Sequence, residues 1–271
     1  MPGDPIELLL GSEHANGARA GGDAIVVEDL AKQYPNGTEA VRGVSFRVSA
    51  GEVFGLLGPN GAGKSTTMGM LGTLVRPTGG RASVAGHDVV AAPRRVRRSI
   101  GFAMQEVGVD DLATGGELLV LHGRLHGLSR REAAHRTELL LELVGIGDAA
   151  RRRMGEYSGG MKRRVDLASA LIHLPPVLFL DEPTEGLDPH GRAAIWTALE
   201  QLKEALGMTI LMTTHFMEEA DRLCDRVAIV DRGRIVVEGT PEDLKGELGA
   251  TDVTLEDVYL QSTGRELELA A

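Results

Sequence analysis

A glycine-rich stretch of nine residues carries the side chains best suited to binding an anion. It follows a short apolar run, residues 53–57, which indicates a buried strand. Its glycines let the backbone turn its N–H groups inward, and the helix that follows adds the positive end of its dipole. The spacing therefore predicts a phosphate-binding loop. The loop consists of Gly58, Pro59, Asn60, Gly61, Ala62, Gly63, Lys64, Ser65 and Thr66.

Two side chains of this loop have a defined chemistry with a nucleoside triphosphate. Lys64 is expected to reach the β- and γ-phosphates as a mobile point charge. The Ser65 hydroxyl is expected to bind the Mg²⁺ ion that bridges those phosphates. A glycine-rich turn that merely precedes a helix is the simpler alternative, and the strand in front of the loop argues against it.

An acidic pair follows a second apolar run in the later half of the chain. Residues 177–180 are all apolar, as expected of a strand buried on both faces of a parallel sheet, and Asp181-Glu182 comes next. The carboxyl ends of such strands deliver ligands. Asp181 is expected to hold Mg²⁺ through water, and Glu182 to polarise an attacking water. The alternative is an ordinary acidic strand end before the Pro183 turn.

A second anion-binding helix start lies at Ser158-Gly159-Gly160, where two glycines expose N–H groups and the serine adds a hydroxyl. Read alone, this is only a helix N-cap. With its neighbours, residues 157–168 resemble the signature loop of ABC-transporter nucleotide-binding domains. The resemblance extends over roughly residues 25–240. It implies that the anion is the γ-phosphate of ATP bound by the other subunit.

Four further positions match this family and take their roles from the resemblance. Gln105, after residues 100–104, resembles the Q-loop glutamine that touches Mg²⁺ or the lytic water and relays its state to the membrane partner. Asp188 resembles the D-loop aspartate that meets the opposite subunit's phosphate loop. His215 resembles the switch histidine that contacts the γ-phosphate, and Tyr34 the aromatic residue that stacks on adenine.

Each of these four positions also has an ordinary interpretation. A histidine after a strand can simply end it, a tyrosine before a proline suits a turn, and Gln105 alone would be unremarkable. The sequence also departs from the family pattern. Met161 stands where many members have Gln, and Glu185 where a small hydroxyl residue is usual. Within residues 112–119, two substitutions change a segment at which the family's helical subdomain faces its membrane partner.

Composition limits the classes of protein that the chain can be. At 271 residues and 42% hydrophobic content it can bury one large α/β core with a smaller subdomain. No apolar run is long enough to span a bilayer, and the first residues lack the positive region of a signal peptide. The single cysteine, Cys224, excludes an internal disulfide, suits a reducing cytoplasm and is expected to be buried as a small hydrophobe. No cluster of metal ligands is present.

The net charge of −10 argues against a general nucleic-acid binder. Two arginine runs, residues 94–98 and 151–153, are locally positive although the chain as a whole is negative. They lack interleaved aromatic residues, so solvated helix faces are the simpler interpretation than polyanion sites.

The predicted fold class is α/β: a P-loop NTPase core, mostly a parallel sheet flanked by helices, with an N-terminal antiparallel β portion and a small helical subdomain. Residues 1–23 are expected to form a mobile leader, residues 24–240 the nucleotide-binding domain with its helical subdomain at about 112–153, and residues 241–271 a short helical extension. Helices are predicted from Glu117 to His126, after Ser129 toward Val144, and after Thr240.

Within the family, the resemblance is to the daunorubicin/doxorubicin-resistance branch, carried by residues 157–161, 213–220, 224–227 and 254–259. It implies a subunit of an exporter that binds and hydrolyses ATP. Such a subunit does not contact the cargo and is held at the cytoplasmic face of the cell membrane. The implied partners are a separate membrane-spanning permease and a second ATP-binding subunit, as a homodimer or half of a pair, with no nucleic acid. The implied cargo is a drug or antibiotic.

Three other functions stay open at this stage. Related branches export lipids or glycans, and a solute importer uses the same kind of ATPase. An importer is disfavoured because no substantial regulatory domain is found beyond about residue 240. A non-transport ABC ATPase of the chromosome or repair type is less favoured, since the interval between the phosphate loop and the signature is short and has no cysteine.

Overall fold

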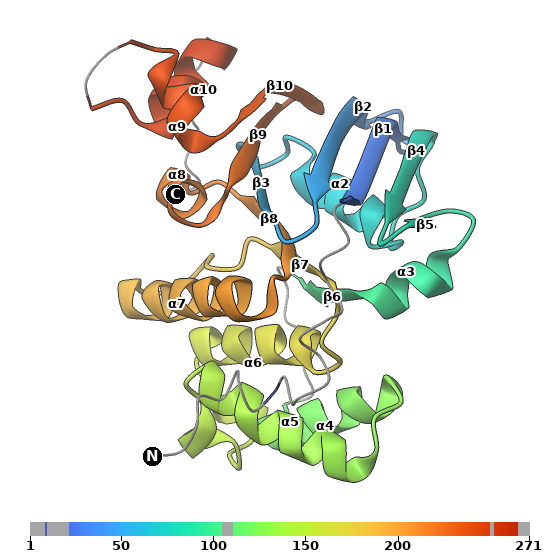
Figure 1. Ribbon diagram of the computed structural model, residues 1–271, viewed down its shortest axis with the longest axis vertical. Coiled ribbons are helices and arrows are strands. Elements are labelled where there is room, and N and C mark those ends of the chain that lie inside the picture. The colour runs from blue at the N-terminus through green and yellow to red at the C-terminus, as the bar shows by residue number, and fades with distance from the viewer. Residues whose placement is uncertain (1–8, 10–21, 105–110, 250–251, 265–271) are drawn as a thin grey trace. The chain divides into compact units, whose positions relative to one another are not determined.

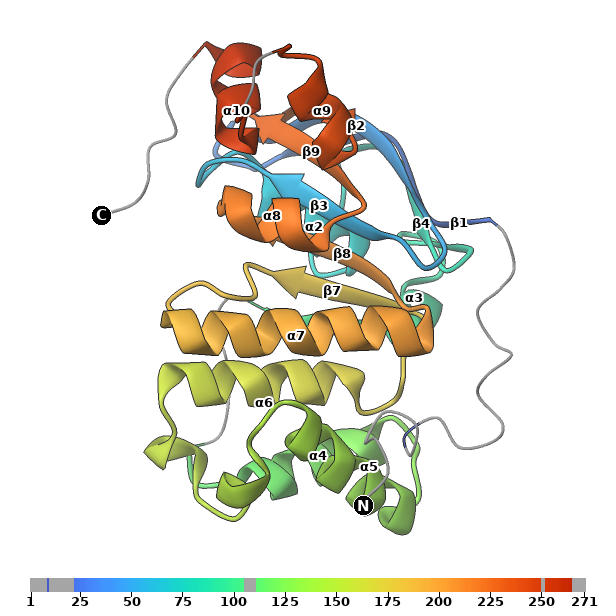
Figure 2. The ribbon, with the colours of Figure 1, turned by 60° about the vertical axis from the view of Figure 1, so that its left-hand side comes forward.

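The computed structural model describes residues 9, 22–104, 111–249 and 252–264. The chain divides into two compact units, each built from segments that are distant in the sequence. Unit 1 combines residues 1–19 with 100–208, and unit 2 combines residues 20–99 with 209–271. Figures 1 and 2 show the elements of both units. The expected leader, residues 1–23, lies almost entirely outside the described residues, and the three domain boundaries stay predictions.

Unit 2 begins with a four-stranded antiparallel sheet in the order β2-β1-β4-β5. Its strands are β1 (Asp23–Gln33), β2 (Glu39–Ser49), β4 (Gly79–Val84) and β5 (His87–Asp88). Burial alternates along β2, as expected of a sheet with one face on a core. The antiparallel N-terminal portion is thus confirmed. The sequence predicts strands only at residues 24–28 and 44–48. Both strands extend further, because bulges near Asp29 (φ 49°) break the alternation while the pairing continues.

A second group of strands in unit 2 contains the parallel core. Its strands are β3 (Val53–Leu57), β8 (Thr209–Thr214), β9 (Arg226–Asp231) and β10 (Arg234–Gly239). β3 pairs in parallel with β8 on one side and β9 on the other, and β10 runs antiparallel to β9. Every residue of β3 and β8 is buried. The Phe46 and Phe54 rings stack with centroids 5.2 Å apart, which ties β2 to β3.

Helices complete unit 2, and one of them, α9, starts after a capping residue that the sequence predicts. The helices are α2 (Lys64–Leu71), α3 (Pro93–Ser99), α8 (Met217–Leu223), α9 (Pro241–Gly246) and α10 (Leu255–Thr263). Thr240 caps α9 by accepting a hydrogen bond from the Asp243 N–H, as predicted. Cys224 ends α8 and is buried, which confirms its prediction. Gly55 makes room for it, since a Cβ at Gly55 would lie 2.7 Å from the sulfur.

Unit 1 is mostly helical around one parallel pair of strands. Its elements are β6 (Ile100–Ala103), β7 (Val177–Asp181), α4 (Gly115–Leu125), α5 (Arg130–Leu143), α6 (Gly159–Leu171) and α7 (Pro189–Leu206). Two 3₁₀ turns, Gly147–Ala149 and Met154–Glu156, lie between α5 and α6. Ser129 caps α5 as predicted. The described helices include none with the length and apolarity needed to cross a bilayer.

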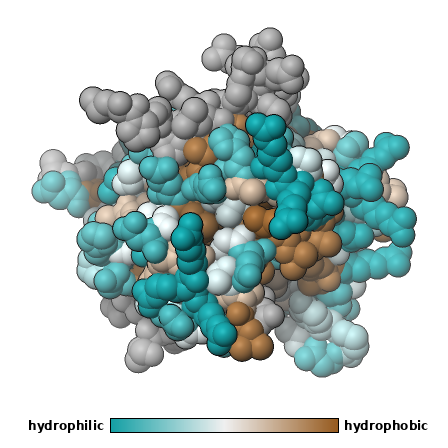
Figure 3. Space-filling model, turned by 90° about the horizontal axis from the view of Figure 1, so that it is seen from below, coloured by the Kyte–Doolittle hydropathy of each residue, from teal (hydrophilic) through white to brown (hydrophobic). Residues whose placement is uncertain are grey.

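The surface of α4 departs from the usual polar exterior. Leu121 and Leu125 lie one turn apart on this helix and are 54% and 75% exposed. Figure 3, which views the molecule from below, shows a mostly hydrophilic face with apolar side chains in several places, the largest group lying to the right of centre. Such a gathering marks a face that contacts another molecule more often than scattered apolar residues do.

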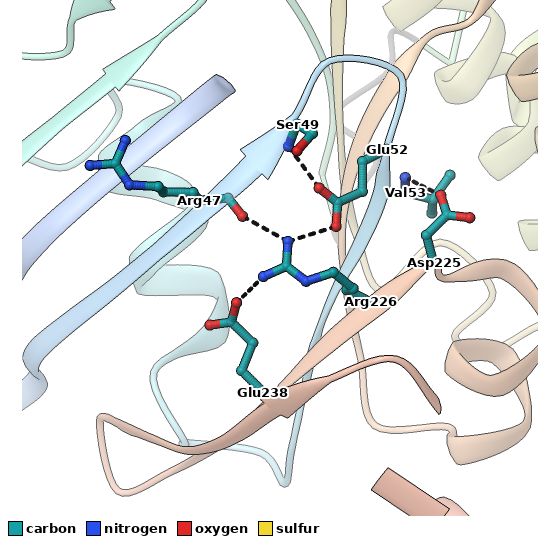
Figure 4. A network of polar contacts seen from close by, with 7 residues as sticks. All are labelled: Arg47, Ser49, Glu52, Val53, Asp225, Arg226 and Glu238. Atoms are coloured by element: carbon teal, nitrogen blue, oxygen red, sulfur yellow. Dashed lines mark hydrogen bonds and ion pairs between the residues drawn. The ribbon is translucent and has the colours of Figure 1, made fainter. Parts of the chain in front are cut away.

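A guanidinium fixes the start of the phosphate-loop strand within unit 2 (Figure 4). Arg226 donates to the Glu52 carboxylate at 2.9 Å and to the Arg47 carbonyl at 3.3 Å, and it pairs with Glu238 on β10. Its guanidinium also lies over the Phe54 ring, 5.2 Å from the centroid. Burial raises the pKa of the Glu238 carboxyl, although Arg226 opposes this effect. Four strands, β2, β3, β9 and β10, are therefore linked through one side chain.

This network predicts the effect of removing its centre. Arg226→Ala should lower the free energy of unfolding by about 2–4 kcal/mol, because it leaves two partly buried carboxylates facing each other. Arg226→Lys should lower the free energy of unfolding by less, since lysine keeps the positive charge and lacks only the planar set of donors of the guanidinium. Urea unfolding of both variants measures the difference. Equal losses for Ala and Lys would show that the charge contributes nothing.

Candidate functional site

The glycine-rich loop is packed tightly against two backbone carbonyls of unit 2. A Cβ at Gly58 would lie 2.2 Å from the Val230 oxygen, and one at Gly63 would lie 2.4 Å from the Ala40 oxygen. Gly63 also has a φ of 105°, in the region that favours glycine. No other residue fits either position without a shift of the backbone. The loop therefore has one defined path between β3 and α2.

Lys64 lies inside this loop rather than reaching away from it. Its ammonium donates to the carbonyls of Gly58 at 2.7 Å and Pro59 at 3.1 Å, and the residue is only 3% exposed. A buried ammonium is costly unless it has strong acceptors. The loop thus keeps a cation at the N-terminal end of α2, where the helix dipole also favours negative charge. The N-cap of α2 is Gly63, so no side chain caps the helix there.

These observations fit a polyphosphate. At Gly61 the φ is 78° and a Cβ would meet no atom within 4 Å, so the loop is open on that side. An open, glycine-lined helix N-terminus next to a lysine is the arrangement that cradles phosphate oxygens. The Ser65 and Thr66 side chains begin the same helix. The role of Ser65 toward a metal ion stays a prediction.

His215 comes to the same edge of the sheet as the loop. β3 and β8 are parallel and Leu57 pairs with Thr214, so the residues that follow both strands emerge together. The Gly58 N–H donates to the Thr214 carbonyl at 3.3 Å, directly before His215. The half-buried His215 ring lies 4.1 Å from that of Phe216. Unit 2 thus brings the predicted histidine beside the predicted phosphate loop.

Tyr34 lies in the turn that joins β1 to β2. Its N–H donates to the Thr38 carbonyl, and its own carbonyl accepts from Gly37. The Lys32 ammonium lies 5.0 Å from the centroid of the Tyr34 ring and donates to the Arg76 carbonyl. A cation over the face of an aromatic ring is attracted to it, so Lys32 helps to hold the Tyr34 ring in place. The role of Tyr34 toward adenine stays a prediction.

In unit 1, the acidic pair lies at the end of a fully buried strand. Asp181 is the last residue of β7, and Asp181 and Glu182 are 9% and 4% exposed. Glu182 has a φ of 50°, a left-handed conformation that costs a residue with a side chain about 1–3 kcal/mol. A strained, buried carboxylate at a strand end is typical of a functional position.

The signature serine and the D-loop aspartate both cap helices. Ser158 accepts from the Met161 N–H at 3.2 Å at the start of α6, and Asp188 accepts from the Gly191 N–H at 2.8 Å at the start of α7. Both side chains are exposed. At Gly159 a Cβ would meet no atom within 4 Å and the φ is not positive. Neither packing nor backbone conformation within the chain explains a glycine there.

One buried residue that the sequence did not single out connects these features. Arg163 on α6 is 5% exposed and donates to the carbonyls of Asp181 and Pro183, which flank Glu182. It also donates to the Met104 carbonyl at the end of β6. A signal was available, since a charged residue at position 163 falls on the same side of the helix as the buried apolar residues of α6.

Asp166 balances part of the Arg163 charge. It lies one turn along α6, with a carboxylate oxygen 3.6 Å from the guanidinium. Burial raises the pKa of the Asp166 carboxyl to about 6, although Arg163 and the Met104 N–H both oppose that shift. Gln105 follows Met104 and lies outside the described residues, so its predicted role stays a prediction. Within the described ranges, no group of three or more His, Cys, Asp and Glu side chains could hold a metal.

Comparison with known proteins agrees with this arrangement. The family model described as ABC transporter matches residues 41–185. The chain is 50% identical over 232 residues to the daunorubicin/doxorubicin resistance ATP-binding protein DrrA of Streptomyces peucetius, covering 86% of this chain and 70% of that protein. It is also 50% identical over 204 residues to the Nod factor export ATP-binding protein I of a Rhizobium species, covering 75% and 67%.

Solved structures show the same fold. The ATP-binding subunit of an ABC transporter matches with a TM-score of 0.79 and 31% identity, covering 89% of this chain and 99% of that one. A cassette, MJ0796, described as a dimer in a post-hydrolysis state with ADP and Pi, matches with a TM-score of 0.74 and 27% identity over 80% and 98%. The fold and site define a P-loop ATPase. The chain belongs to the ABC transporter family, among its ATP-binding proteins.

The contacts of Arg163 predict a catalytic effect that its neighbour should not share. Arg163→Gln should lower kcat for ATP hydrolysis by about tenfold to a hundredfold with little change in KM, because the carbonyls around Glu182 lose their common donor. Arg163→Lys should restore part of the rate. The matched control is Arg164→Gln, whose guanidinium donates to the Val144 and Gly145 carbonyls instead. Equal losses for both variants, or a change in KM alone, would contradict a positioning role.

Proposed function

We propose that the chain is the ATP-binding and ATP-hydrolysing subunit of an exporter that removes a drug or antibiotic through a separate permease. The observation that carries the proposal is the buried Lys64 inside a glycine loop, with His215 emerging beside it. The drug-resistance relative at 50% identity supports the choice of cargo. The resistance to daunorubicin and doxorubicin for which that relative is named supports a compound of the same kind as the cargo of this chain.

The residues of the phosphate loop account for binding of the nucleotide. Lys64 neutralises phosphate charge, the loop N–H groups donate hydrogen bonds to the phosphate oxygens, and Tyr34 offers a ring face to adenine. We infer that Ser65, Asp181 and Gln105 hold Mg²⁺. When bound, that ion would neutralise charge on the phosphates and help to orient them. The donor set supports this inference, since hydroxyl, carboxylate and amide oxygens are the ligands Mg²⁺ prefers.

Glu182 is the residue we assign to activation of water. Its carboxylate is buried, follows Asp181 directly and is held in a conformation that the turn must enforce. The carbonyls on either side of it accept hydrogen bonds from Arg163, so the backbone around it is fixed. A base whose position is fixed needs little reorganisation when it takes a proton. His215 would contact the γ-phosphate from unit 2.

We propose that the working unit is a dimer in which Ser158, Gly159 and Gly160 complete the site of the other subunit. The open space around Gly159 supports this, because a glycine without an internal reason suits a backbone that another molecule approaches closely. Asp188 is exposed and would meet the opposite phosphate loop while it caps α7. The related cassette described as a dimer is consistent with this arrangement.

The permease is proposed to dock on unit 1. A groove of about 960 Å³ is lined by residues of α4, α5 and the turns after α5, including Thr114, Glu138, Leu141 and Glu142. Part of the lining falls within residues 112–119, where the resemblance puts the membrane partner. This docking would hold the chain at the cytoplasmic face of the cell membrane.

A second candidate function is export of a lipid-linked glycan. It is favoured by the Nod factor export relative, which is as similar in identity as the drug-resistance relative. The cargo distinguishes the two. With the permease present, ATPase stimulation by an anthracycline supports the first, and stimulation by a lipooligosaccharide supports the second. A solute importer and a non-transport ATPase have no comparable support.

The assignment of Glu182 leads to a direct test. Glu182→Gln should preserve ATP binding and lower hydrolysis by about 10²-fold or more, because an amide cannot accept the proton. Glu185→Gln, three residues along the same turn, is the matched control and should retain most of the rate. The measurements are ATP affinity by calorimetry and phosphate release. Turnover above a tenth of wild type in Glu182→Gln would refute the assignment.

The shared site leads to a mixing experiment. Lys64→Ala and Ser158→Arg subunits should each be poor ATPases alone, and should regain partial activity when mixed, because a mixed dimer contains one intact site. Ser129→Arg provides the control, since Ser129 caps α5 just as Ser158 caps α6. It should stay active if capping is all that the substitution disturbs. A rate that does not rise on mixing would indicate a self-contained monomer.

A further inference from the structure

The surface of unit 2 carries a group of arginines that form no ion pair with any carboxylate in the described part of the chain. Helix α3 is short, with Val96 fully buried and its arginines exposed around that anchor. Within residues 73–99 the sequence has six arginines and a single carboxylate, Asp88. That carboxylate accepts from the N–H groups of Val90 and Ala91, so it caps the turn before α3.

Other arginines of this unit behave differently. Arg47 pairs with Asp23 at 2.8 Å, and Arg81 pairs with Glu28 at 3.1 Å. Among the described residues, no ion pair involves Arg76 or the four arginines of α3. These five form what we call the arginine patch: Arg76, Arg94, Arg95, Arg97 and Arg98.

Exposed apolar side chains lie near the arginines of the patch in the sequence and in the fold. Arg97 donates to the Thr73 hydroxyl at 3.0 Å, which fixes α3 against the turn between α2 and β4. The same turn contains Arg76 and Leu74, and Leu74 is 57% exposed. Val90, just before α3, is 48% exposed. The patch therefore combines concentrated positive charge with apolar groups that also face outward.

Apart from the hydrogen bond from Arg97 to Thr73, the patch makes no side-chain hydrogen bond or ion pair with the described residues that would stabilise the fold. Arg94 lies three and four residues from Arg97 and Arg98, and like charges at these spacings destabilise a helix by a few tenths of a kcal/mol per pair. The chain as a whole has a net charge of −10, so carboxylates are not scarce. Local repulsion without compensation points to an anionic partner outside the chain.

The chemistry of the surface distinguishes between polyanions. Binding of single-stranded nucleic acid uses aromatic side chains as stacking platforms, and α3 with the turns beside it has none. A bilayer interface instead accepts guanidinium groups at its phosphates and small apolar side chains between its headgroups. We propose that the arginine patch binds anionic phospholipid headgroups and so holds unit 2 against the membrane surface. The choice of a membrane rests on the proposed function, which places the chain beside a permease.

The test uses the purified full chain without a permease. Vesicles of phosphatidylcholine containing phosphatidylglycerol are compared with vesicles of phosphatidylcholine alone by co-sedimentation. Wild type should bind the anionic vesicles, and added salt should weaken the binding. Replacing Arg94, Arg95, Arg97 and Arg98 together by Gln should reduce the affinity several hundredfold, at about fivefold for each charge near the surface. Replacing the same four by Lys should retain most of it.

The other arginine run provides the matched control. Replacing Arg151, Arg152 and Arg153 together by Gln removes three exposed charges from unit 1. Because these residues lie outside the patch, the triple substitution should change the affinity for anionic vesicles by less than about twofold. Leu74→Ser should weaken binding to anionic vesicles without abolishing it. ATP hydrolysis should be unchanged in every variant, because none of these residues belongs to the nucleotide site.

Three outcomes would overturn the proposal. These are equal binding to both kinds of vesicle, equal losses from the two arginine runs, and an oligonucleotide that binds through the patch more tightly than the anionic vesicles. If the fourfold Gln variant loses ATPase activity, its loss of vesicle binding could come from misfolding. The fourfold Lys variant then tests the proposal, since it keeps the positive charge and must keep the binding to anionic vesicles. Absence of ATPase activity in the wild type would instead refute the proposed function, whatever the vesicles show.

Discussion

The path of the phosphate loop depends on two backbone carbonyls, those of Ala40 and Val230, which lie so close to Gly63 and Gly58 that no side chain fits at either position. This contact ties the loop to β2 on one side and to the end of β9 on the other. The turn after β9 adds to it, since the Gly233 N–H donates to the Ala62 carbonyl and its own carbonyl accepts from Arg42. The antiparallel sheet and the β9–β10 hairpin are therefore parts of the nucleotide site, although neither supplies a catalytic side chain.

Arginine serves the same structural purpose in both units. Arg226 joins strands in unit 2 through carboxylates and a carbonyl, and Arg163 joins strand ends to the signature helix in unit 1 through carbonyls alone. A guanidinium presents several donors in one plane, so it can hold several acceptors at once. Carbonyl oxygens at strand ends have no partner along the strand, and a fixed donor there settles the direction in which the chain leaves the sheet.

The sequence predicted elements whose signals are local. Capping residues predicted the starts of α5 and α9, and apolar runs predicted β3 and β7 because both faces of a parallel strand are buried. The long antiparallel strands were underestimated, since a bulge interrupts their alternation near Asp29. Fixed spacing also identified the phosphate loop, and His215 was placed correctly beside it because parallel strands end at one edge.

Features that depend on contacts between distant residues could not be predicted. Arg163 was passed over since nothing in its spacing shows that the carbonyls of residues 104, 181 and 183 converge on it. The arginine run at residues 94–98 was interpreted as a solvated face, because a sequence does not show which arginines find carboxylates. A chain of net charge −10 is repelled by an anionic surface over most of its area, so one uncompensated patch determines which face can approach. Whether an arginine forms an ion pair with a carboxylate of its own chain, rather than how many arginines there are, thus distinguishes arginines that stabilise the fold from arginines available to a partner.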